Sequence, residues 1–194
     1  PDEIVAEFGA DAVRLYEMFM GPFEDGQPWD PKGVIGTERF LKRVWKLGTE
    51  SLFAYSRELE NNGAGRQGLE RKEGDKDLER LLHRTIKKVG EDIAGFHFNT
   101  AVSALMILLN ELEKNTASLS SDTWTSFVKL LHPFAPHMAQ ELWEQLGHKT
   151  FLDFEPWPKY EARYIQDETF ELIIQVNGKV RDVIFVPSGT TQGE

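Results

Sequence analysis

The sequence predicts a mainly α-helical protein, a helical bundle followed by a β-hairpin. Several long stretches repeat apolar residues at the three- to four-residue spacing of a buried helix face. Residues 130–147, which read LLHPFAPHMAQELWEQLG, contain two helical patterns joined by a proline corner. Near the end, two β-branched runs flank Asn177 and Gly178, a pair suited to a tight type I′ turn.

The composition limits the kinds of site and the classes of protein that this chain can represent. It has 194 residues, no cysteine and a formal net charge of −10, so disulfides and thiolate zinc sites are excluded. No apolar run reaches membrane-spanning length and no signal peptide is evident, so we expect a cytoplasmic protein. The acidic balance argues against a general nucleic-acid binder, and RNA contacts would have to come from local basic surfaces.

The first 33 residues predict two short helices and a connector. Proline and two acids open the first helix, which ends at Gly9, and Asp11 caps a second helix that stops at Gly21. The connector GPFEDGQPWDPKG is rich in turn residues, and we expect Trp29 to anchor it.

Two longer helices follow, and each carries a row of basic residues opposite its apolar side. The first is expected from residue 34 to about 61, and its first basic row comprises Arg39, Lys42, Arg43 and Lys46. Residues 61–74 read as a surface loop. The next helix is expected over about 76–96, and its second basic row comprises Arg80, Arg84 and Lys87, with His83 at the same spacing.

Three more helices complete the predicted bundle. One starts with Asn99 or Thr100 as its cap, one covers residues 120–131, and one follows Pro136 and stops at Gly147. Residues 148–168 predict a tether over the bundle surface, and residues 169–194 contain the hairpin. The organisation is therefore 1–33, 34–147, 148–168 and 169–194.

Four stretches in this order resemble leucyl-tRNA synthetases of class I more than the valyl, isoleucyl or methionyl enzymes. They are PDEIVAEFGADAVRLYEMFMGP, GTERFLKRVWKL, LLHPFAPHMAQELWEQLG and ELIIQVNGKVRD. The resemblance implies that 1–33 ends the catalytic region, that 34–147 is the anticodon-binding helical bundle, and that 169–194 begins a C-terminal domain. Both chain ends are therefore expected to be internal to a longer protein.

The resemblance also implies a function for the longer parent protein, which would join leucine to tRNA(Leu) with ATP and Mg²⁺. HIGH and KMSKS motifs and an editing domain are missing from these 194 residues. We therefore expect no catalysis, cofactor or metal site in this chain. Its expected role is to position tRNA(Leu), and in the parent it would pack on the catalytic domain. The rival is a structural bundle that buttresses that domain and has little RNA affinity.

The two basic rows are the candidate tRNA-binding residues. Lysine and arginine neutralise phosphates without reading bases, and the resemblance favours this for the first row most. The alternative is a solvated helix face, which such charge patterns usually are. Lys179 and Arg181 alternate along the second hairpin strand and are weaker candidates, because charge also protects a strand edge.

Three other features of the sequence lead to predictions. His132 and His137 flank the proline corner without metal-binding spacing, so we expect them to hydrogen-bond locally. The tryptophans Trp45, Trp124 and Trp143 are expected in the core. An isolated hairpin is only marginally stable, so residues 170–186 must pack on the bundle, pair with another copy or be mobile. Of these, we expect edge-to-edge pairing with a neighbouring chain.

Overall fold

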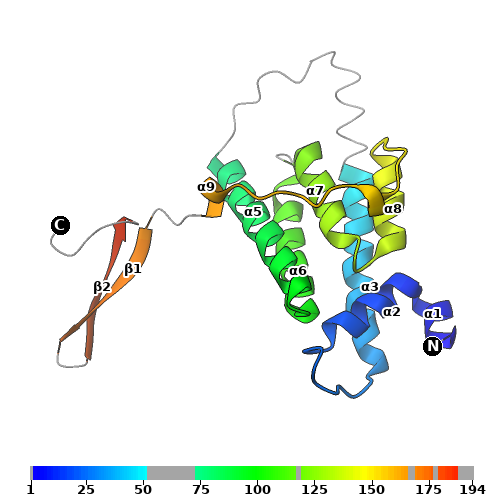
Figure 1. The fold of residues 1–194 in the computed structure, drawn as a ribbon, viewed down its shortest axis with the longest axis horizontal. Helices are drawn as coiled ribbons and strands as arrows, with labels where there is room; N and C mark the ends of the chain where they lie inside the picture. Colours follow the sequence, from blue (N-terminus) through cyan, green and yellow to red (C-terminus); the bar gives the residue numbers. More distant parts are fainter. Residues whose placement is uncertain (1, 52–72, 117–118, 166–168, 177–178, 188–194) are drawn as a thin grey trace, which may run out of the picture. The chain divides into compact units, whose positions relative to one another are not determined.

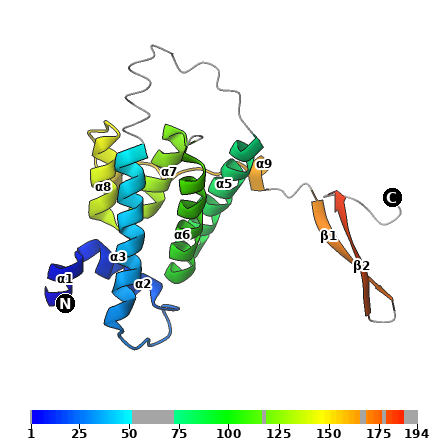
Figure 2. The ribbon, with the colours of Figure 1, turned by 180° about the vertical axis from the view of Figure 1, so that it is seen from behind.

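A computed structural model describes residues 2–51, 73–116, 119–165, 169–176 and 179–187. The chain divides into two compact units, residues 1–160 and 161–194. The first unit is helical (Figures 1 and 2), as predicted for a bundle of this type. No helix in the described part is long and apolar enough to cross a membrane.

In the described residues, the helices of the first unit run from Asp2 to Phe154. Their bounds are α1 Asp2–Phe8, α2 Ala10–Phe19, α3 Pro31–Lys46, a π-helical turn Leu47–Ser51, α5 Glu73–Ala94, α6 Phe98–Lys114, α7 Ser121–Leu131, α8 Pro136–Gln145 and a 3₁₀ turn Leu152–Phe154.

The helix starts show how far local sequence predicts boundaries. Helix α3 begins at Pro31, earlier than expected, because the Asp30 side chain accepts a hydrogen bond from the Lys32 backbone at 3.0 Å and caps it. The expected continuation to residue 61 lies largely outside the described residues. Helix α6 begins at Phe98 rather than at an Asn99 or Thr100 cap, and the Thr100 hydroxyl instead donates to Asp92 on α5.

One apolar core runs through the first unit and includes α2. Ala12, Leu15 and Tyr16 of α2 are buried together with the apolar sides of α3, α5, α6, α7 and α8. Helix α6 contributes four leucines at 0% exposure to this core: Leu105, Leu108, Leu109 and Leu112. Burial of this kind is the main favourable term in folding, so the segment expected to end a catalytic region is structurally part of the bundle.

The proline corner is central to this core, as predicted. Phe134 and Ala135 between α7 and α8 are fully buried, and so are Trp124 on α7 and Trp143 on α8. Gly147, at φ 90°, ends α8 in the left-handed region, where glycine has no steric cost. The Gly147 backbone donates to Glu144 and that of His148 to Trp143, which is the pairing of a Schellman motif.

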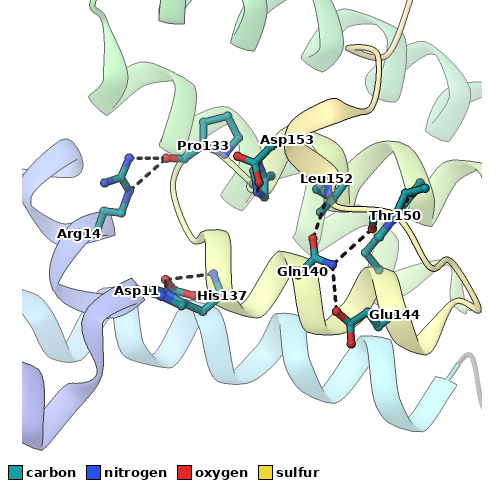
Figure 3. Close-up of polar contacts among 11 residues, drawn as sticks. Asp11, Arg14, Pro133, His137, Gln140, Glu144, Thr150, Leu152 and Asp153 are labelled. Atoms are coloured by element: carbon teal, nitrogen blue, oxygen red, sulfur yellow. Dashed lines mark hydrogen bonds and ion pairs between the residues drawn. The ribbon is translucent and has the colours of Figure 1, made fainter.

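Side chains from α2 and α8 hold the corner in place (Figure 3). Arg14 donates from Nε and Nη2 to the Pro133 carbonyl at 3.2 and 3.1 Å. Gln140 of α8 accepts from the Leu152 backbone at 3.0 Å and donates to the Thr150 carbonyl at 3.4 Å. The residues after α8 are therefore pinned to it, and Leu152 is buried.

The second unit contains a short helix, α9 Ala162–Ile165, and an antiparallel pair of strands, β1 Thr169–Val176 and β2 Lys179–Pro187. Val176 pairs with Lys179 next to the turn, and the expected turn residues Asn177 and Gly178 lie outside the described residues. Further along, Ile174 pairs with Asp182 while Gln175 pairs with Val180. Arg181 is thus an extra residue in β2, a β-bulge.

Candidate nucleic-acid interface

The first basic row lies on the side of α3 that faces away from the core. Val34, Phe40, Leu41 and Val44 on the opposite side are buried, which follows from the helical spacing of apolar residues. Arg39, Lys42 and Lys46 are exposed, whereas Arg43 is half-buried. The structure therefore brings the four predicted residues onto one helix face but gives them different surroundings.

Arg43 is held by helix α6. Its Nε donates to one carboxylate oxygen of Glu113 at 3.1 Å, and its Nη2 donates to the other oxygen and to the Asn110 side chain. The hydrogen bonds to Glu113 raise the pKa of Arg43 above its ordinary value. This two-pronged contact is typical of arginine and carboxylate. It joins α3 to α6.

Acidic residues also accompany Lys42 of the first basic row and Lys87 of the second. Lys42 Nζ lies 2.6 Å from the Glu38 carboxylate, one helical turn away. On α5, Lys87 Nζ lies 3.9 Å from Glu91. Exposed pairs of this kind contribute little to stability, but they reduce the positive field that a phosphate would meet.

The second basic row lies on α5, on the side opposite the buried Leu78, Leu82 and Val89. Arg84 is exposed, and Arg80 and Lys87 are half-buried. Helix α6 stands between α3 and α5 in both views (Figures 1 and 2). The two rows are therefore separate strips, each one helix wide.

The sequence reasoning missed three residues at this surface. Lys32 precedes Arg39 by two helical turns and Lys76 precedes Arg80 by one, and both are exposed. The same i, i+3, i+4, i+7 spacing extended by one step could have found them. Glu113 had no such signal, because its partner lies 70 residues away along the chain.

The strand candidates Lys179 and Arg181 are both in β2. The bulge at Arg181 interrupts the regular alternation on which their common orientation was predicted. Their contact with RNA stays a prediction, now with a weaker geometric basis.

The histidines of the corner have separate partners. His137 Nδ1 lies 2.7 Å from the Asp11 carboxylate, and His132 Nε2 lies 3.9 Å from Asp153. In the part of the chain that the structure describes, no three His, Asp or Glu side chains are grouped so that they could hold a metal ion.

Trp45 differs from the other two tryptophans that were expected in the core. Its side chain is 37% exposed, next to Lys46 of the first basic row. It lines an apolar groove of about 560 Å³ with Phe8, Leu41 and Met138. The expectation of a buried Trp45 was wrong because helical periodicity does not reveal where a neighbouring helix leaves one edge of α3 uncovered.

Comparison with known proteins places these surfaces in context. Residues 75–192 match the family model described as the anticodon-binding domain of tRNA ligase. Leucine–tRNA ligase of Leptospira biflexa is 45% identical over 187 residues, which are 96% of this chain and 20% of that protein. Leucine–tRNA ligase of Treponema pallidum is 41% identical over 198 residues, covering 96% of this chain and 22% of that protein.

A solved structure is similar over the whole fold. It is the ternary complex of Agrobacterium radiobacter K84 agnB2 LeuRS with tRNA and LeuAMS, which is 33% identical with a TM-score of 0.80. The match covers 99% of this chain and 25% of that one. The predicted resemblance to leucyl-tRNA synthetases is thereby confirmed, and this chain spans about a fifth of the length of the curated relatives it matches.

Proposed function

Because the chain belongs to the anticodon-binding domain family of tRNA ligases, we propose that it is the tRNA-binding helical region of a leucyl-tRNA synthetase. Its task is to position tRNA(Leu) so that the acceptor end reaches an active site elsewhere in the parent protein. The observation that carries the proposal is the exposed strip of Arg39, Lys42 and Lys46 on α3. Its cations are spaced along one face, as contacts to successive phosphates require.

The second basic row has a supporting role in this proposal. Arg80, Arg84 and Lys87 form a strip of their own on α5. A phosphate backbone is a long ligand, so separate strips can contact it at separate points. No base is read by either row, because lysine and arginine contacts to phosphates carry no sequence information.

The parent protein would ligate leucine to tRNA with ATP and Mg²⁺. Neither cofactor is assigned to a residue of this chain. This chain alone is proposed to be inactive. Edge-to-edge pairing of residues 170–186 with another chain, and a cytoplasmic location, stay predictions.

A structural role for the bundle is the competing proposal. The net charge of −10 and the carboxylates beside the basic rows favour it. In this proposal the basic residues of α3 serve only to keep the protein soluble. The bundle then has the catalytic domain as its sole partner.

A salt titration separates the two proposals. The chain is titrated with tRNA(Leu) and a non-cognate tRNA at several salt concentrations, as wild type and as Arg39→Ala/Lys42→Ala. A matched control, Lys149→Ala/Lys159→Ala, removes two exposed charges elsewhere. If the α3 residues contact phosphates, the negative slope of log K against log salt becomes less steep by about 0.9 for each contact removed. This change is expected in the α3 variant and not in the control variant. Equal losses in both variants, or no binding at low salt, would favour the structural role.

A further inference from the structure

The Arg43 guanidinium lies in the first basic row, yet its hydrogen bonds are made within the protein. Both nitrogens on one edge of the guanidinium, Nε and Nη2, donate to Glu113 on α6. Nη2 also donates to Asn110. An edge with two parallel donors is the one that a two-pronged phosphate contact would use, and here a carboxylate and an amide already occupy it.

Glu113 is the more consequential member of this pair. Its side chain is 34% exposed and lies beside a strip proposed to bind phosphates. Without a partner, its negative charge would repel an approaching phosphate and reduce the field of Arg39 and Lys42. Arg43 cancels that charge and does so in a fixed geometry.

We propose that Arg43 is a positioning residue of the tRNA-binding surface: it clips α3 to α6 and neutralises Glu113, and it does not itself bind phosphate. This assignment rests on the proposed function. It removes Arg43 from the residues of the first basic row that were predicted to bind tRNA. The phosphate contacts of the row are then made by Arg39, Lys42 and Lys46, and the clip keeps their strip at a set distance from α6.

The clip also explains why an unfavourable acid is tolerated beside the basic row. Arg43 is 40% exposed and Glu113 is half-buried, so the pair is partly screened by water and contributes modestly to stability. Its larger effect is on the local charge. Removing either Arg43 or Glu113 would change the net charge beside the strip by one elementary charge.

The test compares Arg43→Ala, Arg43→Ala/Glu113→Ala and Arg39→Ala in salt titrations with tRNA(Leu). Arg43→Ala should weaken binding by up to about fivefold, because Glu113 becomes unpaired. It should leave the slope of log K against log salt unchanged. The double variant has the net charge of the wild type and should regain most of the lost affinity. Arg39→Ala should instead lower the slope by about 0.9.

Two results would overturn the proposal. A slope that falls by about 0.9 in Arg43→Ala would identify a lost phosphate contact. A double variant that stays as weak as the single variant would show that Glu113 is not the group that Arg43 controls.

Failure of the proposed function gives a different result. If the wild-type chain binds no tRNA at low salt, the proposed tRNA-binding role is wrong. The effect of Arg43→Ala on tRNA affinity then cannot be measured. The contact between Arg43 and Glu113 is then judged by thermal unfolding of Arg43→Ala, Glu113→Ala and the double variant. Losses in the two single variants, Arg43→Ala and Glu113→Ala, that sum to more than the loss in the double variant would retain the clip; additive losses would remove it.

Discussion

The Asp11 carboxylate on α2 accepts a hydrogen bond from the backbone N–H of Met138, at 2.7 Å, in the first turn of α8. The same carboxylate meets the His137 ring and backbone (Figure 3). Helix α8 has no side-chain cap of its own at Ala135. Its cap therefore comes from a helix 127 residues earlier in the chain, where a negative charge also suits the positive end of the helix dipole.

Removing this cap should destabilise the fold. Asp11→Ala leaves N–H groups at the start of α8 without an acceptor, and we expect a loss of about 1–2 kcal/mol in the free energy of unfolding. His137→Ala, which keeps the Asp11 contact to Met138, should cost less than about 0.5 kcal/mol because the ring is exposed. Urea unfolding of both variants measures this. Equal losses would mean that the ring, not the backbone, is what Asp11 holds.

Two glycine-to-alanine changes should act in opposite directions. Gly147→Ala forces an alanine to φ 90° and should cost about 1 kcal/mol. Gly36→Ala, in the middle of α3, adds a methyl group that meets nothing within 4 Å and should stabilise the protein by about 0.5–1 kcal/mol. Melting temperatures of the two variants check both signs. A destabilised Gly36→Ala would contradict the described path of α3.

Gly48 in the π-helical turn is tightly enclosed. A Cβ atom there would lie 2.7 Å from Leu142 Cδ2 and 2.9 Å from Trp124 Cζ2. We expect Gly48→Ala to cost about 1–3 kcal/mol. In Gly48→Ala/Leu142→Ala the loss should be smaller than the sum of the single losses, because the second change removes the closer of the two contacts. Strict additivity in denaturant unfolding would place the two residues apart.

Lowering the pH should weaken the contacts by which Glu155 holds the segment after α8. A hydrogen bond from Thr150 at 2.8 Å, and then one from Lys129, lower the pKa of Glu155 below its ordinary value, although slight burial opposes them. Because the folded pKa is the lower one, this stabilisation is present above the unfolded value of 4.5 and is lost as the pH falls through the folded pKa.

The Glu155→Gln variant tests this dependence. It should be less stable than the wild type at neutral pH, and the difference in melting temperature should shrink as the pH is lowered below 4.5. Glu24→Gln, which changes an exposed acid of the connector, serves as the control and should show no such convergence. A constant difference across this pH range would mean that Glu155 acts through neutral hydrogen bonding alone.

Most of the helical architecture followed from local signals. In α5 the buried residues Leu78, Leu82, Ile86 and Val89 recur at the three- to four-residue spacing of one helix face. The glycine stop at Gly147 and the proline corner were also predicted correctly, because both depend on backbone properties of single residues. The candidate site was predicted as a set of faces, and the exposure of Arg39, Lys42 and Lys46 agrees with that.

What the sequence by itself determined is which side of each helix is apolar and which is charged, since a 3.6-residue period sets that without reference to neighbours. Only the tertiary structure decided the partners across helices: Glu113 for Arg43, Met138 for Asp11, and an open edge beside Trp45. Those pairings depend on how far each helix slides and turns against the next. Packing of the whole core determines that position, and no spacing within one helix encodes it.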